Sequence, residues 1–332
     1  MRKLLLGTTA LAAAASLTAN AALADVSISG MLEWSYNSRS STIADSDGTS
    51  FTQDSDMQIN FSNKTDSGLD VGMRVDFHTD STTDDGANAG DETSLSIAGG
   101  FGKIVLGKDD SAADAYSMDE SDLIQEDEAP GVGSMTISTN SEISLGDGDL
   151  NKIAYHLPAM GGLTAGVSFY DSGTADGSSS DTTAYGAQYA MDAAGAGITL
   201  AYQTSTTENS TQDIDSDSMG LKIVSGDISM IISQSTYEAS DEDRQSQGAS
   251  ISYKMPNGMT IGAYTFKSED DLDAGEEYTR SGAEVAYTIA SGLSAVINVD
   301  DYEYKLGTNA DATGAAGSDS GTNSSLTIKA SF

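Results

Sequence analysis

The feature of this sequence that most constrains its fold is a period-two alternation of apolar and polar residues, which recurs from Val26 to Phe332. The segment Leu293–Val299, with the sequence LSAVINV, is one example. Alternation with a period of two gives a β-strand one apolar and one polar face. When such strands fill a chain behind a secretory leader, they predict a transmembrane β-barrel with an apolar lipid face and a polar interior.

The first 24 residues have the composition of a secretory signal peptide. Arg2 and Lys3 form a basic start, an Ala- and Leu-rich stretch follows, and Ala22–Ala24 offers a small-x-small cleavage site. No later run reaches the ~18 apolar residues of a transmembrane helix. We therefore expect an exported chain, mature from residue 25 to residue 332, that enters the membrane with strands.

The apolar parity predicts sixteen antiparallel strands, joined by connections that alternate between short and long. The short connections contain Gly, Asn or Asp, which tight hairpins favour. Outer-membrane barrels combine short periplasmic turns with longer extracellular loops in this way. The predicted fold is thus a sixteen-stranded all-β transmembrane barrel, and its predicted strands are residues 26–36, 56–64, 69–78, 92–98, 103–109, 151–157, 163–171, 182–190, 198–205, 218–224, 228–237, 246–254, 259–267, 278–288, 293–304 and 324–332.

Parity also predicts which side chains face the lumen. A Lys or Arg on the lipid face at mid-depth would cost ~2–4 kcal/mol, so mid-strand charges should point inward. The strand at 293–304 fits poorly, because Tyr302 and Tyr304 are out of phase with Ile297 and Val299, and this predicts a bulge. The charged residues with lumen parity are Arg74, Asp76, Lys152, Lys222, Arg280 and Glu284.

The charge balance narrows the function. The chain has 51 acidic residues against 15 Lys and Arg, a net charge of −36. Nucleic-acid binding is excluded, because phosphate contacts need a basic face. An acidic surface attracts cations and also suits a saline habitat, and the two explanations are compatible.

One connection, residues 110–150, is much longer than the others and has little periodicity. No Lys or Arg lies between Lys108 and Lys152, whereas acidic residues are frequent there. Loops of this length without regular structure are usually functional. The connection is therefore the first place to look for a functional site.

Several segments of the sequence together resemble a known protein family. The secretory leader, the start DVSISG at 25–30, the segment FGKIVLGKDD at 101–110 and the terminal Phe332 together resemble Gram-negative general porins, most closely the Rhodobacter-like branch of the alphaproteobacteria. The resemblance implies a homotrimer of barrels whose third loop folds inward to make a constriction, with acids on the loop facing bases on the wall. It also implies outer-membrane lipid and lipopolysaccharide as surroundings, and barrel-assembly machinery that reads Phe332 as a signal.

The chain departs from the family pattern where the strand before the third loop should carry bases. Val105 occupies the position within the strand where the family carries a basic residue, and only Lys108 matches a basic residue of the family pattern. The constriction should therefore be dominated by acids. We predict a passive channel for small hydrophilic solutes and ions that prefers cations; a solute-selective channel and a non-conducting anchor barrel are the alternatives. The predicted constriction residues are Asp109, Asp110, Asp114, Asp119, Glu120 and Asp122 on the loop, with Arg74 and Lys108 facing them.

The sequence contains few residues that point to catalysis or to a bound cofactor. His78 and His156 are the only histidines, and no nucleophile stands out beside them, so an enzyme is not expected. Two acidic clusters carry oxygen ligands of the kind that Ca²⁺ prefers, although neither completes an EF-hand loop and both also suit solvated loops. The weak Ca²⁺ candidates are Asp45, Asp47, Asp147 and Asp149.

Overall fold

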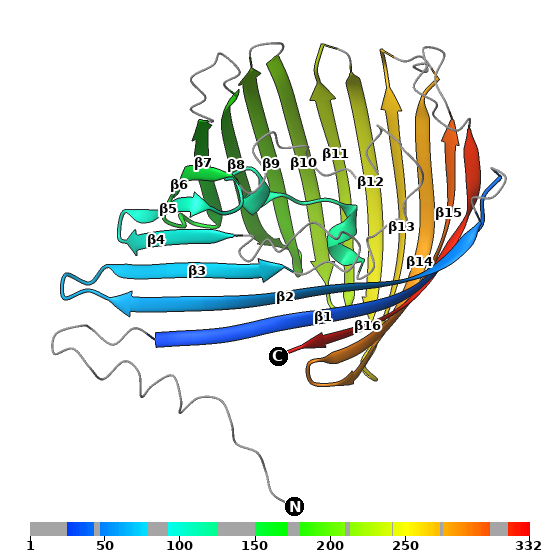
Figure 1. Ribbon diagram of the computed structural model, residues 1–332, viewed down its shortest axis with the longest axis horizontal. Coiled ribbons are helices and arrows are strands. Elements are labelled where there is room, and N and C mark those ends of the chain that lie inside the picture. Colours follow the sequence, from blue (N-terminus) through cyan, green and yellow to red (C-terminus); the bar gives the residue numbers. More distant parts are fainter. Residues whose placement is uncertain are drawn as a thin grey trace, which may run out of the picture.

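The chain forms a closed barrel of sixteen antiparallel strands (Figure 1). The computed structural model describes residues 25–42, 47–78, 92–124, 150–171, 180–209, 213–240, 242–272, 275–305 and 318–332. The strands are β1 (Asp25–Arg39), β2 (Gly48–Lys64), β3 (Asp70–His78), β4 (Thr93–Gly99), β5 (Gly102–Lys108), β6 (Asn151–His156), β7 (Leu163–Asp171), β8 (Ser180–Ala193), β9 (Ala196–Asn209), β10 (Asp213–Ser225), β11 (Ile228–Glu238), β12 (Asp243–Lys254), β13 (Met259–Asp270), β14 (Glu277–Ala290), β15 (Leu293–Lys305) and β16 (Asp319–Ser331). The predicted fold class is confirmed.

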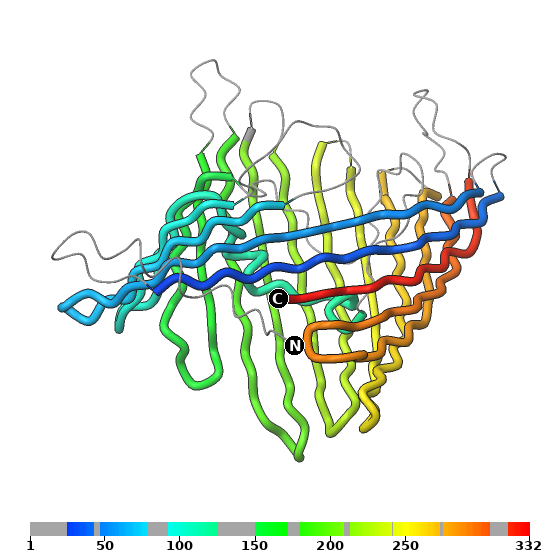
Figure 2. Tube along the Cα trace, turned by 60° about the horizontal axis from the view of Figure 1, so that its bottom comes forward, coloured from blue at the N-terminus to red at the C-terminus, as the bar shows by residue number. Residues whose placement is uncertain are grey.

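The barrel closes between its first and last strands. Trp34 on β1 is paired with Gln53 on β2 and with Ile328 on β16. Figure 2 shows β1 and β16, blue and red, running side by side. Closure removes the free edges of the sheet, so the backbone polar groups of every strand find partners in a neighbouring strand.

Several strands extend beyond their predicted ends. β2 begins at Gly48 rather than at residue 56, and β16 begins at Asp319 rather than at residue 324. These extensions are rich in Ser, Thr and Asp on both faces, so they lack the alternation that reveals a strand although the backbone ladder continues. The connections 239–242 and 255–258 are in consequence equally long, and the strict alternation of loop lengths does not hold there.

The predicted faces are confirmed by burial. Large apolar side chains on the outer parity, including Ile153, Met219 and Ile297, are exposed and form the belt that meets lipid. Ser, Thr, Gly and charged residues alternate with them on the inner face. No helix within the described ranges is long and apolar enough to cross a membrane.

The predicted bulge that would bring Tyr302 and Tyr304 into phase is wrong; the register shift of β15 with β14 lies at the other end of the strand, between Thr288 and Ala290 of β14. Tyr302 and Tyr304 are only 3% and 5% exposed, and the register of β15 with β16 runs without a shift from Leu293 to Tyr304. Both tyrosines share the inner parity of Val296 and pack inside the barrel with Phe266 and Tyr278. Aromatic residues on this strand therefore fill the lumen side and do not belong to the outer belt.

Candidate functional site

The segment after β5, which we call the third loop (Asp109–Ile124), lies inside the barrel. It contains two short 3₁₀ helices, η2 (Asp114–Tyr116) and η3 (Glu120–Leu123). Figure 1 shows it crossing from β5 to the inner side of β11–β13, and η3 contacts these three strands. The inward-folded third loop is thus present over these residues, while residues 125–149 lie outside the described ranges.

Hydrogen bonds to the wall fix the loop along its length. The backbone N–H of Ala112 donates to Oγ of Ser168 on β7 (2.9 Å), and Oη of Tyr116 lies 3.0 Å from Nδ1 of His156 on β6. Near its end, Oγ of Ser233 on β11 donates to a carboxylate oxygen of Glu120 (3.0 Å). The loop is attached to at least three strands, which makes it a fixed part of the lumen.

Glycines on the inner face give the loop its space. A methyl group added at Gly220 on β10 would lie 2.6 Å from the carbonyl oxygen of Met118, closer than any ordinary contact. A methyl group at Gly186 would lie even closer to the carbonyl oxygen of Ala112, and one at Gly248 would overlap the side chain of Glu120. We call these three positions the glycine track. Glycine has no side chain, so the loop can lie directly against the wall at these positions.

At the start of the loop, one arginine is shared by several carboxylates. Arg74 on β3 forms ion pairs with Asp76, with Glu92 (2.6 Å) and with Asp109 (3.4 Å). These residues and the exposed Asp110 form the constriction cluster, and three of them, Arg74, Asp109 and Asp110, line a cavity of about 390 Å³. The first loop carboxylates and Arg74 therefore meet on one wall of the lumen, formed by β3, β4 and β5, with acids in excess.

Glu92 was not among the predicted site residues, although it is central to this cluster. Its side chain is buried next to Arg74 just before β4. Burial, together with the charges of Asp110 and Asp109 and a hydrogen bond with Asp76, raises the pKa of Glu92 to about 8 despite the opposing charge of Arg74. Glu92 is thus mainly protonated at neutral pH.

The predicted loop acids have different environments. Asp110 and Asp122 are exposed, and Asp109 and Asp114 are partly buried. Asp119 is buried and accepts a hydrogen bond from the backbone N–H of Ser121 (2.7 Å), which caps η3, and Glu120 is buried against β11 and β12. The sequence could not separate these groups, because their spacing says nothing about which side of the loop meets the wall.

Lys108 does not face the loop acids, which corrects the prediction. It shares the parity of Leu106 and Ile104, the outward side chains of β5, and it is the last residue of that strand. Lys103, which has the opposite parity together with Val105, lines the cavity instead. Applying the period-two rule to β5 would have identified Lys103.

The other predicted wall residues lie apart from the constriction cluster, with one exception. Lys152 on β6 is buried and its Nζ donates to the carbonyl oxygen of Asp109 (2.5 Å), which makes it a support of the loop. Arg280 pairs with Asp300 (3.1 Å) inside the wall of β14 and β15, where Glu284 is also buried. Lys222 is on β10, and its charge acts on Asp122 of the loop.

Three of the four weak Ca²⁺ candidates, Asp45, Asp147 and Asp149, lie outside the described residues. Asp47 accepts a hydrogen bond from the backbone N–H of Ser41 (2.6 Å), which is ordinary loop structure. Phe332, the proposed assembly signal, is 85% exposed, and its backbone pairs with Gly30 of β1 (2.9 Å). Its side chain is therefore available to a partner at the barrel seam.

A closed sixteen-stranded barrel with an apolar outer belt and a loop folded into its lumen is the architecture of an outer-membrane channel. The sequence profile of the Gram-negative porins matches residues 7–329. The chain therefore belongs to the Gram-negative porin family, a family of channels in the outer membrane.

Solved structures support the same fold. An anion-selective porin from Comamonas acidovorans is 16% identical, with a TM-score of 0.65 over 93% of this chain and 100% of its own. A mutant of the Rh. blastica porin is 15% identical, with a TM-score of 0.66 over the same shares. A loop-deleted outer membrane protein of Vibrio cholerae is 13% identical, with a TM-score of 0.65 over 93% of this chain and 99% of its own. No curated protein sequence matches the chain.

Proposed function

We propose that this porin is a passive diffusion channel for small hydrophilic solutes and ions and that it prefers cations. The observation that carries the preference is the constriction cluster, where the guanidinium of Arg74 is shared by the carboxylates of Asp76 and Asp109 and by the mainly protonated Glu92. Asp110 adds an exposed carboxylate next to them. Asp76, Asp109 and Asp110 outnumber Arg74 and Lys103, the bases that line the cavity, so a cation passing the cluster meets an excess of negative charge.

The size of the effect follows from Coulomb's law. Two unit charges ~8 Å apart interact by ~0.5 kcal/mol in water and by ~2 kcal/mol at an effective dielectric of 20. Several carboxylates acting together could then exclude anions while binding each cation weakly. Salt should weaken the preference, because the screening length falls from ~10 Å at 0.1 M to ~3 Å at 1 M.

Three alternatives make different predictions. An anion-preferring pore, as in the Comamonas acidovorans relative, would have the opposite sign of selectivity. A solute-selective channel would conduct small ions and saturate with one solute. A non-conducting anchor barrel would show no channel activity, although sixteen strands enclose a lumen too wide for side chains alone to fill.

The deciding experiment is the zero-current potential of the purified protein in a planar bilayer under a KCl gradient. The double variant Asp110→Asn, Asp122→Asn removes the two exposed loop carboxylates and should shift the potential toward non-selective behaviour. Asp227→Asn, in the short turn after β10, is the matched control and should leave the potential unchanged. An anion preference in the wild type, or no shift in the double variant, would contradict the proposal.

We further propose that residues 1–24 are removed on export, that the barrel assembles as a homotrimer in lipopolysaccharide-containing membrane, and that the assembly machinery reads Phe332. The exposed phenyl ring at the seam supports the last point, and family membership supports the others. N-terminal sequencing of the mature protein and its native mass would test the first two. Deletion of Phe332 should reduce insertion in vivo, and normal insertion would contradict the signal role.

A further inference from the structure

A second group of ionisable side chains lies beyond the constriction cluster on the same wall. Asp54 and Asp56 are two residues apart on β2, so they face the same side of the sheet, and His78 on β3 is the register partner of Asp56. His78 shares the inward parity of Arg74, which borders the lumenal cavity. The three side chains, which we call the β2–β3 triad, therefore face the lumen.

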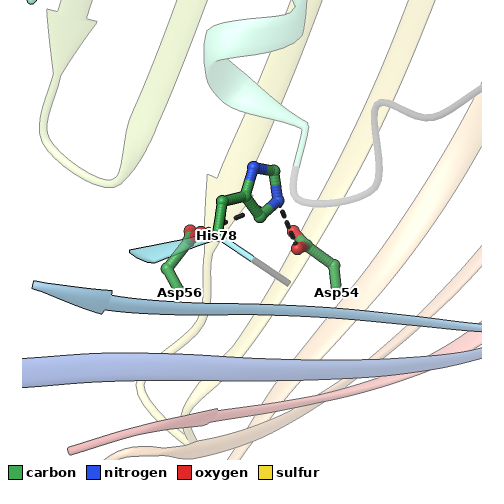
Figure 3. A group of neighbouring side chains, drawn as sticks. All are labelled: Asp54, Asp56 and His78. Carbon is green, nitrogen blue, oxygen red and sulfur yellow. Dashed lines mark hydrogen bonds and ion pairs between the residues drawn. The ribbon is translucent and has the colours of Figure 1, made fainter. Parts of the chain in front are cut away.

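Figure 3 shows the imidazole of His78 between the two carboxylates. Nε2 of His78 lies 2.7 Å from Oδ1 of Asp54 and 3.7 Å from Oδ1 of Asp56. One potential ligand atom from each residue lies within 4.8 Å of the other two. Two hydrogen-bonded strands hold the three Cα atoms, so small side-chain rotations are enough to direct all three toward one point.

The triad is also open to the lumen. Its side chains are between about a third and a half exposed, with Asp56 the most accessible. An ion could enter from water without displacing packed residues. It could also keep water molecules in the coordination positions that the protein does not fill.

We propose that the β2–β3 triad binds a divalent transition-metal ion of the Zn²⁺ or Cu²⁺ type. An imidazole nitrogen and two carboxylate oxygens suit these ions, with water completing the coordination. The imidazole separates this site from one for Ca²⁺ or Mg²⁺, which prefer oxygen ligands alone. A metal bound there would add positive charge to the lumen wall and reduce the passage of cations.

The constriction cluster is less suited to a transition-metal ion than the β2–β3 triad. Ligand atoms of Glu92, Asp109 and Asp110 also lie within 4.8 Å of one another. They include no imidazole, however, and Arg74 already pairs with two of the three carboxylates. Within the described residues, the metal proposal therefore rests on the β2–β3 triad.

The binding test uses the detergent-solubilised full-length mature protein and two probes, ZnCl₂ in calorimetry and CuCl₂ in electron paramagnetic resonance. We expect one ion per chain and a Cu²⁺ spectrum with nitrogen coupling. His78→Ala should raise the Kd at least about tenfold, the scale on which even indirect support of a metal ligand acts, and should remove the nitrogen coupling. Asp54→Asn should weaken binding with the coupling retained.

His156→Ala is the matched control, since it removes the only other imidazole and should leave both readouts unchanged. Heat-modifiable migration on gels shows that each variant is a folded barrel. An absence of binding in the wild type would identify the triad as an ion pair only, and an unchanged Kd in His78→Ala would place the metal elsewhere; either result overturns the proposal. Binding is measured without a membrane, so a barrel that fails to conduct contradicts the channel and leaves this test intact.

Discussion

Two walls of the same lumen use arginine in different ways. On the short strands β3–β6, the side chain of Arg74 is 33% exposed and serves three carboxylates beside the cavity. On the long strands β14 and β15, the side chain of Arg280 is 5% exposed, pairs with Asp300 and lies 5.1 Å from the ring centre of Tyr264. The comparison shows that lumen parity alone does not make a charge part of the pore.

Packing explains the difference. The wall of β13–β15 carries Phe266, Tyr278, Tyr302 and Tyr304 on its inner face, and these rings exclude water from neighbouring charges. A buried charge must be paired and hydrogen-bonded, and Asp300 also accepts a hydrogen bond from the side chain of Asn323 (3.1 Å). Among the described residues, no such cluster of rings lies on the β3–β6 wall, so Arg74 and Asp110 remain accessible to passing ions.

The largest effect should come from Arg280→Ala, which leaves Asp300 buried without its cation. Breaking one partner of a buried pair costs about 3–5 kcal/mol. Urea unfolding in detergent, followed by the fluorescence of the single tryptophan, Trp34, measures it. Arg74→Ala should cost less, because the side chain of Arg74 is already 33% exposed and the neighbouring Glu92 is mainly protonated at neutral pH. Equal losses in the two variants would break the comparison between the walls.

A smaller loss is expected when the third loop is forced off the wall. Gly220→Ala places a methyl group 2.6 Å from the carbonyl oxygen of Met118. Such overpacking costs about 1–3 kcal/mol, and the displaced loop should change the single-channel conductance. Gly48→Ala is the control, because an added methyl group there meets no atom within 4 Å. An unchanged conductance in Gly220→Ala would mean that the glycine track does not set the position of the loop.

The variant Arg74→Gln tests the β3–β6 wall by its effect on ion selectivity. Removing the guanidinium of the constriction cluster increases the excess of negative charge there, so the cation-to-anion permeability ratio should rise. A rise of at least about twofold corresponds to ~0.5 kcal/mol, the interaction of two charges ~8 Å apart in water. The ratio is obtained from zero-current potentials in KCl. Arg280→Gln, in protein that remains folded, should change it less, and a larger change there would reverse the assignment of the two walls.

The sequence predicted the number of strands and their faces, because lipid on one side and water on the other impose a period of two. It missed the polar ends of β2 and β16, where both faces meet water and alternation disappears. Its out-of-phase tyrosines, Tyr302 and Tyr304, led to the prediction of a bulge, although they pack inside the barrel.

Within the site, the sequence led to Arg74 and Asp109, which do meet. It could not predict Glu92, whose role depends on packing beside Arg74 and not on any motif. It also could not show that Glu120 is buried against the wall while Asp110 is exposed. These differences come from tertiary contacts that strand periodicity does not encode.

The smallest predicted effect is a pH dependence on the β3–β6 wall. The pKa of Glu92 is raised from 4.5 to about 8, so Glu92 gains its charge as the pH rises from 7 to 9. The cation preference should increase over this interval, because one more carboxylate then opposes Arg74 beside Asp109 and Asp110. Glu92→Gln should have a flat profile between these pH values.

Stability should change in the opposite direction. Between about pH 4.5 and pH 8 the folded barrel keeps on Glu92 a proton that the unfolded chain has lost, so the free energy of unfolding should fall as the pH rises through this window. Above about pH 8 both states are ionised at this residue and its contribution becomes constant. Urea unfolding of the wild type and of Glu92→Gln at pH 6 and pH 9 isolates the difference. For the selectivity prediction, the contradicting outcome is a cation preference that rises equally with pH in the wild type and in Glu92→Gln. That result would show that another group on this wall carries the titration.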